Sequence, residues 1–231
     1  MTEKVARREG FGDVLADGVK VAAEKIGKGA EEFAIHIHGQ EVPMHDPKRF
    51  IHYGTTYLDA TPARHTQGNE GMTGMPASGL ELPPFDPQSC AGRGEVHKIT
   101  NNLGHVMNCA GVCSYGYSSM DASALPEFLN LVTGWDYGID DLLKIGERIA
   151  NIRQAFNIRE GISTSDFKVP NRVLGRPPLQ AGPTAGREID IETLRREYLL
   201  AMDWDPESGK PSKRKLLELG LEDVAEALWP R

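Results

Sequence analysis

The sequence GWDYGIDDLLKIGERI fills residues 134–149 and continues as ANIRQAFNIREG to Gly161. Apolar residues recur along it every three or four positions, at Ile139, Leu142, Ile145, Ile149, Ile152 and Phe156. This spacing is that of one face of an α-helix. The stretch therefore predicts a long amphipathic helix over Asp140–Ile158, which Gly161 ends.

Shorter stretches of the same pattern flank this helix. We expect further helices over Asp13–Ile26, Val96–Val106, Leu125–Val132, Ile191–Met202, Lys213–Leu219 and Glu222–Leu228. Phe33–Gly39 instead alternates with period two, which is typical of a strand with His36 and His38 on one side. The sequence therefore predicts a mainly α protein with one short β element near its N-terminus.

Two segments lack a clear period. Residues 42–87 form a long irregular loop rich in Pro, Gly, Asp and His, with a short helix expected within Arg49–Ala60. A loop of this length is uncommon in a compact domain and is usually functional. Val169–Arg187 is rich in Pro and Gly and is typical of an extended surface arm.

Composition limits the classes of protein that fit. The chain has 231 residues, of which 39% are hydrophobic and 26% charged, as in folded domains. Its net charge of −7 argues against general nucleic-acid binding. No apolar run is long enough to span a bilayer, and residues 1–13 lack the apolar core of a signal peptide. Three cysteines are too few for a disulfide framework, so we expect a cytoplasmic protein.

The motif Asn108-Cys109-Ala110-Gly111-Val112-Cys113 holds two of the three cysteines around a glycine. On a helix, residues four apart share one face. An iron–sulfur cluster usually takes four thiolates and a structural zinc takes four ligands, so this chain, with Cys90 distant, does not complete a Cys₄ site by itself. The alternative interpretation is that Cys109 and Cys113 are buried, unreactive thiols.

Five histidines fall between residues 36 and 65, namely His36, His38, His45, His52 and His65. One hypothesis is that His36, His38 and a third histidine bind a single metal ion. The alternative is that these histidines lie in loops and at a strand edge and bind no metal. His97 and His105 lie in a predicted helix and are interpreted as structural or solvated. The acidic residues are expected on solvated helix faces, and no phosphate-binding loop or nucleophile elbow is present.

Segments in the same order along the chain resemble the C-terminal part of the aldehyde:ferredoxin oxidoreductase family. They are Arg8–Asp13 with Leu15–Gly18, Glu41–Lys48, the 108–113 motif, Gly134–Ile149, and Gly209–Pro211 with Lys215–Leu221. The resemblance implies helical domains, with residues 1–45 as the end of the second domain and 46–231 as the C-terminal domain. It also implies a tungsten or molybdenum bis-pterin and a 4Fe–4S cluster.

Residue roles follow from the matching positions of the family motif. Cys113 falls on the cysteine that ligates the cluster, and Gly111 and Val112 on the backbone that lines a pterin. Asn108 stands where the family has an acid that contacts the pterin; an amide still donates and accepts hydrogen bonds, so Asn108 is a candidate pterin contact. His65 follows Asp59–Arg64 as the family's active-site histidine does, and an imidazole exchanges protons near neutral pH.

The resemblance also shows which parts of the family lie outside this sequence. The pterin-binding β domain and the CxxCxxxC segment with the other three cluster thiolates are not in it. We therefore expect a partner or further domains that carry them, ferredoxin as electron acceptor, and no activity of this chain alone. The alternative function is a non-catalytic helical interaction module derived from the family.

Overall fold

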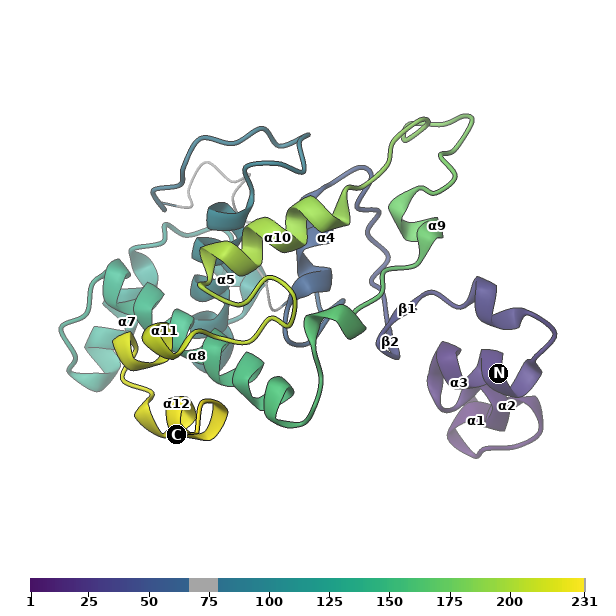
Figure 1. The fold of residues 1–231 in the computed structure, drawn as a ribbon, viewed down its shortest axis with the longest axis horizontal. Helices are drawn as coiled ribbons and strands as arrows, with labels where there is room; N and C mark the ends of the chain where they lie inside the picture. Colours follow the sequence, from purple (N-terminus) through teal and green to yellow (C-terminus); the bar gives the residue numbers. More distant parts are fainter. Residues whose placement is uncertain (67–78, 231) are drawn as a thin grey trace.

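The protein is mainly α-helical, as predicted (Figure 1). The structure is a computed structural model that describes residues 1–66 and 79–230. Its α-helices are α1 (Thr2–Ala6), α2 (Phe11–Leu15), α3 (Gly18–Ile26), α4 (His52–Thr55), α5 (Gly94–Cys109), α6 (Ser114–Tyr117), α7 (Ala124–Thr133), α8 (Ile139–Arg159), α9 (Asn171–Leu174), α10 (Ile191–Ala201), α11 (Lys213–Glu218) and α12 (Glu222–Leu228). The 3₁₀ turns are η1 (Ala30–Phe33), η2 (Thr56–Leu58) and η4 (Thr164–Asp166). The strands β1 (His36–Ile37) and β2 (Gln40–Glu41) pair antiparallel, with Ile37 opposite Gln40.

Helices α5 and α8 form the centre of the fold. They approach closely at Gly146, where a Cβ would collide with the main-chain carbonyl of Asn102. Helix α10 lies on another side of α5 and comes equally close at Gly94, against the carbonyl of Glu197. Glycine at both positions lets the backbones approach without a side chain between them. The two contacts fix α5 between its neighbours.

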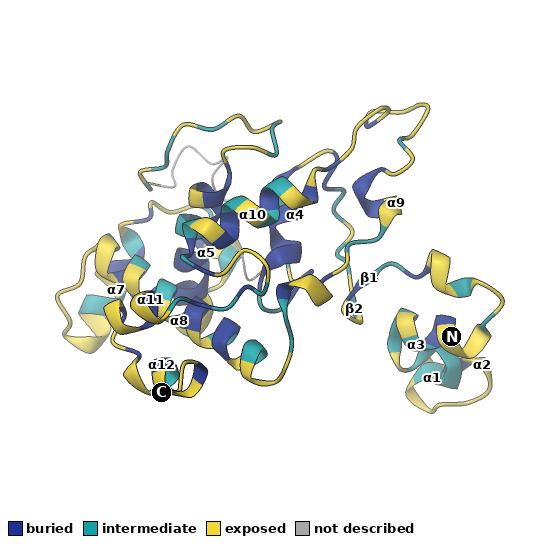
Figure 2. Ribbon diagram, in the orientation of Figure 1, coloured by how far each residue is buried: buried dark blue, intermediate teal, exposed yellow. Residues whose placement is uncertain are grey.

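The largest hydrophobic core lies where α10, the α4–η2 segment and the segment after α8 meet. It includes Tyr57, Phe167, Leu194 and Trp204, all nearly inaccessible to solvent. Figure 2 shows the buried residues gathered along the facing sides of α4, α5 and α10. Two further clusters pack α5, α7 and α8 together, and α8 against α11 and α12. Burial of this apolar surface is the main force that holds the helices together.

The N-terminal helices α1–α3 pack on one another, apart from the main body in Figure 1. The predicted helix over Asp13–Ile26 is wrong in one respect, since it is broken into α2 and α3. Gly18 takes φ +86°, a left-handed value that interrupts a right-handed helix. Among the described helices, none has the length and apolar character needed to cross a membrane.

Other helix predictions are confirmed to within a few residues, including α8, α10 and α12. The short helix expected within Arg49–Ala60 is present as α4 and η2. The predicted strand is wrong in length, because His38 and Gly39 have φ values of +50° and +87° and form the turn after β1. Val169–Arg187 is not simply a surface arm, since it contains α9, whose Leu174 is buried in the main core.

Candidate functional site

A buried carboxylate begins the loop that leads to His65. Asp59 is 3% exposed and follows η2 directly. One of its oxygens lies 2.8 Å from Arg153 Nη1 of α8, and the other accepts a hydrogen bond of 3.1 Å from Asn101 Nδ2 of α5. His105 Nε2 of α5 lies 3.6 Å from the same second oxygen. Two helices thus compensate a charge that burial alone would make costly.

These contacts set the protonation states of the buried groups. Burial by itself raises the pKa of Asp59. The charges of Arg153 and His105 oppose this effect, as do hydrogen bonds from Thr61 and Asn101, and together they bring the pKa below its ordinary value. Burial lowers the pKa of His105 to about 4, with Asp59 opposing the shift and Arg153 adding to it. At neutral pH the group is an ionised Asp59 and Arg153 beside a neutral imidazole.

The His65 loop, residues 59–66, is held by side chains of α8 and α5. Arg153 Nη2 donates to Thr61 Oγ1 at 2.6 Å, and Asn157 Nδ2 donates to the Ala60 carbonyl at 2.7 Å. At the far end, Asn108 Nδ2 donates to the Thr66 carbonyl at 3.1 Å. The loop is therefore fastened to α8 and α5 at its start and to α5 at its end.

His65 lies half-buried near the end of this loop. Its ring is 4.9 Å from that of His45, which stacks on Tyr53 at 4.2 Å. The pKa of His65 is lowered, first by burial and then by the neighbouring His45. A neutral, partly accessible imidazole of this kind can accept a proton.

The cysteine turn, residues 108–113, begins in the last turn of α5. Gly111 has φ +71°, the Val112 N–H donates to the Met107 carbonyl at 3.0 Å, and the Gly111 N–H donates to the Asn108 carbonyl at 3.3 Å. This pair of bonds is a Schellman motif, which requires a residue in the left-handed conformation. The glycine is thus needed by the backbone of the turn.

Both cysteines of the turn are exposed. The interpretation of Cys109 and Cys113 as buried thiols is therefore wrong. The expectation that they share one helix face is also wrong, because Cys109 ends α5 whereas Cys113 follows the Schellman turn and precedes α6. Cys90 is only partly buried and packs against the main core. Cys113 therefore presents its thiol at the surface.

Asn108 connects the two features. Besides its bond to Thr66, its amide donates to the Gly104 carbonyl at 2.9 Å within α5. The structure therefore brings together His65, Asn108, Gly111, Val112 and Cys113 around the C-terminal end of α5. This is the set of site residues that the sequence predicts, although their roles stay predictions.

The histidine–metal hypothesis fails in the part of the chain that the structure describes. No group of three or more His, Cys, Asp or Glu side chains there is arranged to hold a metal ion. His36 Nδ1 accepts a hydrogen bond of 3.2 Å from the Gly39 N–H, and His38 packs edge-on against Phe167. His97 and His105 are structural but not solvated, since both are buried.

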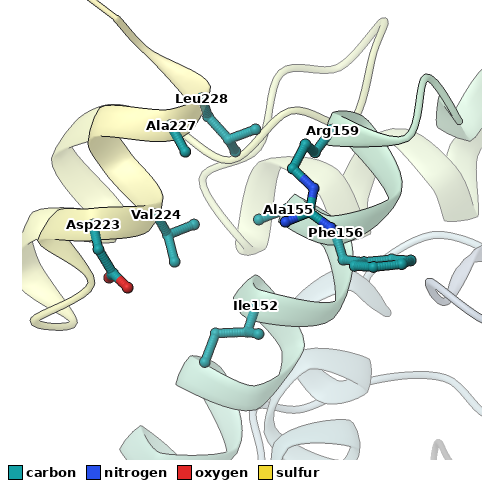
Figure 3. Close-up of a pocket in the computed structure, with 8 residues that line it drawn as sticks. All are labelled: Ile152, Ala155, Phe156, Arg159, Asp223, Val224, Ala227 and Leu228. Atoms are coloured by element: carbon teal, nitrogen blue, oxygen red, sulfur yellow. The ribbon is translucent and has the colours of Figure 1, made fainter.

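A surface groove lies elsewhere, between α8 and α12 (Figure 3). Its lining is largely apolar, with Ile152, Ala155 and Phe156 from α8 and Val224 and Leu228 from α12. Arg159 lies 5.1 Å above the Phe156 ring, and Asp223 stands across the groove on α12. The groove contains no histidine or cysteine, so it lacks the chemistry that the end of α5 offers.

The Asp59 network is the functional feature that the sequence analysis missed. It contradicts the expectation that acidic residues are solvated. One signal was present: His97, Asn101 and His105 recur every four residues and so share one face of the predicted helix over Val96–Val106. Three polar residues on one face indicate a buried polar contact as readily as a solvated one.

Known proteins match this chain over most of its length. The family model for aldehyde ferredoxin oxidoreductase, domains 2 & 3, matches residues 1–221. Tungsten-containing aldehyde ferredoxin oxidoreductases from Pyrococcus horikoshii and Pyrococcus furiosus are 31% and 30% identical over 95% of this chain. The chain spans 36% of the length of each of these relatives.

A solved structure shares the fold. It is the active site complex BamBC of benzoyl coenzyme A reductase in complex with 1,5-dienoyl-CoA, which superposes with a TM-score of 0.65 at 22% identity, over 97% of this chain and 38% of that one. At this identity the likeness concerns the fold alone. On the sequence match over residues 1–221, the chain belongs to the aldehyde ferredoxin oxidoreductase family, in the region of its domains 2 and 3.

Proposed function

We propose that this chain forms the C-terminal part of a tungsten- or molybdenum-pterin enzyme that oxidises an aldehyde to a carboxylic acid. Water supplies the added oxygen, and two electrons leave through an iron–sulfur cluster to ferredoxin. The tungsten-containing relatives support the metal and the reaction class. The observation that carries the proposal is the exposed Cys113 thiol beside the anchored His65 loop.

The cysteine turn fits one ligand of a 4Fe–4S cluster. Cys113 is exposed, and among the described residues other than its chain neighbours no atom lies within 4 Å of the place where a Cβ on Gly111 would be, so a bulky group has room to approach. A cluster takes four thiolates, and Cys113 supplies one of them. The other three come from the part of the relatives that this chain does not cover, which is why we propose that the chain alone is inactive.

The cysteine turn also fits a pterin, because its backbone offers hydrogen-bond acceptors, although its N–H donors are already used. The N–H groups of Gly111 and Val112 are engaged in the Schellman motif. Their carbonyl oxygens accept no hydrogen bond from the described residues. Pterin rings carry amino groups, which donate to such oxygens. We assign to Gly111 and Val112 the backbone contacts with this cofactor.

His65 is the residue that we assign to proton transfer at the substrate. The reaction releases protons, and a neutral imidazole accepts one at the ring nitrogen that faces the substrate. The lowered pKa of His65 keeps this nitrogen unprotonated at neutral pH. The pterin-bound metal supplies the two-electron chemistry, and the protein positions the substrate and the proton acceptor.

Exposed apolar side chains on α6 and α7, the two helices that follow the cysteine turn along the chain, support a missing contact. Leu131 and Val132 of α7 are 83% and 85% exposed, and Tyr115 of α6 is 87% exposed. Large apolar side chains grouped at a surface mark an interaction site. We propose that these side chains pack against the domain that supplies the other cluster ligands.

The test is co-expression with a polypeptide that corresponds to the uncovered part of the relatives, under anaerobic conditions. We expect a complex with iron, tungsten or molybdenum, and aldehyde-dependent viologen reduction. Cys113→Ser should lower the iron content and abolish the cluster's EPR signal. Cys109→Ser is the matched control, since it removes an exposed thiol four residues earlier and should change neither.

His65→Gln should retain both metals and lose most of the aldehyde-dependent activity. Equal iron content in Cys113→Ser and in the unsubstituted complex would contradict the cluster assignment. A chain that binds partner protein but never metal would favour the helical interaction module instead.

A further inference from the structure

Asn108 stands where the resemblance to the family leads one to expect an acid, and its amide has a specific use in this structure. Nδ2 donates to two carbonyl oxygens, that of Gly104 at 2.9 Å and that of Thr66 at 3.1 Å. The first bond lies within α5, and the second reaches across to the residue after His65. A carboxylate at this position has no hydrogen to donate and would face both oxygens with like charge.

The two ends of the His65 loop depend on side chains to different extents. Four side chains, those of Asn101, His105, Arg153 and Asn157, contact residues 59–61. Arg64, His65 and Thr66 have one hydrogen bond within the described residues, and it is the bond from Asn108 to the Thr66 carbonyl. Asn108 therefore anchors the end of the loop that carries His65.

We infer that Asn108 is a positioning residue, whose carboxamide clips the His65 loop to the end of α5 directly before the cysteine turn. The clip places His65 and Cys113 on one rigid unit, since Asn108 belongs both to α5 and to the turn. The use of the clip in catalysis rests on the function proposed above. The clip itself is a property of this chain.

The inference also changes the role assigned to Asn108 from the family resemblance. Both amide hydrogens are occupied by protein carbonyls, so Asn108 does not donate to a pterin while the clip is closed. The amide thus acts on the cofactor site through the position of His65.

The first test uses the intact chain without cofactor. In NMR spectra of the unsubstituted protein we expect close contacts between ring protons of His65 and His45, whose centroids are 4.9 Å apart. Asn108→Ala removes the donor without adding charge. It should weaken these contacts and raise the pKa of His65 toward the ordinary value of about 6.5, because the ring then moves away from its half-buried position and from His45.

Asn108→Asp should disrupt the ring contacts more than Asn108→Ala, because its carboxylate repels the Thr66 carbonyl. Asn171→Ala and Asn171→Asp make the same changes at an exposed asparagine of α9 and should leave His65 unaffected. All four variants should melt close to the unsubstituted chain, since none removes a core residue. Unchanged His65–His45 contacts and an unchanged His65 pKa in Asn108→Ala would overturn the inference.

A second test separates the clip from the proposed function. In the co-expressed complex, Asn108→Ala should lower kcat and shift its pH profile while iron content stays as in the unsubstituted complex. If the unsubstituted complex carries neither cluster nor activity, the proposed function fails, whereas the NMR result on the chain alone still decides the clip.

Discussion

The two ends of the His65 loop meet the rest of the protein in opposite ways. Asp59 is 3% exposed and is surrounded by charged and polar groups from α5 and α8. Thr66 lies at the surface and is held by the amide of an exposed asparagine. One end is completed by the fold of this chain. The other end is bound to Asn108, directly before the exposed thiols of the cysteine turn, where we propose that further protein or cofactor binds.

Within the eight residues of the His65 loop, the buried end therefore serves stability and the open end serves function. Groups at the buried end contribute to folding, and their replacement should be visible in the free energy of unfolding. Groups at the open end contribute little to folding, and their replacement should be visible in reactivity and in cofactor binding. The predictions below follow this division.

The largest effect is expected for Arg153→Met. It removes the cation 2.8 Å from Asp59 and leaves a buried carboxylate with only neutral partners. Losing one member of a buried ion pair costs about 3 kcal/mol or more. Urea denaturation should show this loss. Arg148→Met, at an exposed position of the same helix, should cost far less, and equal losses in the two variants would contradict the contrast between the ends.

Acid should destabilise the buried end. Burial lowers the pKa of His97 and of His105 to about 4 in the folded protein, whereas an unfolded histidine titrates near about 6.5. Between these values the unfolded chain binds more protons, so the free energy of unfolding falls as the pH falls from about 6.5 to 4. The lowered pKa of Asp59 extends the loss below pH 4.

His105→Gln should flatten this dependence, because it removes one buried group that must take up a proton on unfolding. We expect about 1–3 kcal/mol less loss between pH 7 and pH 4, measured by urea titrations at each pH. His38→Gln, at an exposed turn position, serves as the control. A His105→Gln curve parallel to that of the unsubstituted protein would show that His105 takes up its proton as readily in the folded as in the unfolded state.

The smallest effect on stability is expected at the open end. Cys113→Ser should change the free energy of unfolding by less than about 0.5 kcal/mol, as surface substitutions do. Labelling should still distinguish the sites. Cys109 and Cys113 should react with a maleimide much faster than Cys90, which packs against the core and whose thiol pKa is raised, chiefly by burial. Slow labelling of Cys113 would indicate that the turn is covered.

The sequence predicted what is local. Helix α12 spans the predicted residues, and α8 differs from its prediction by one residue at each end, because their apolar periods are regular. Gly111 and Cys113 were found from a motif of six residues. The break at Gly18 was missed because its apolar neighbours continue the helical period across the glycine, whereas the backbone does not.

The Asp59 network was beyond prediction for a different reason. Its members are distant in sequence: Asn101 is 42 residues from Asp59 and 97 from Tyr198, to whose hydroxyl it also donates. Nothing in one sequence pairs an aspartate in a loop with polar residues on three helices. The same distance of 42 residues separates Asn108 from Thr66, so the clip too becomes visible only in the fold.

The close approach of α5 and α8 at Gly146 has a consequence for the His65 loop. Asn108 belongs to α5 and Arg153 to α8, so the two side chains that hold the ends of the His65 loop lie on different helices. A Cβ at residue 146 would collide with the Asn102 carbonyl oxygen, so the two helices approach closely only because residue 146 has no side chain. A side chain at residue 146 would push α5 and α8 apart, and the side chains that hold the His65 loop would then shift relative to each other.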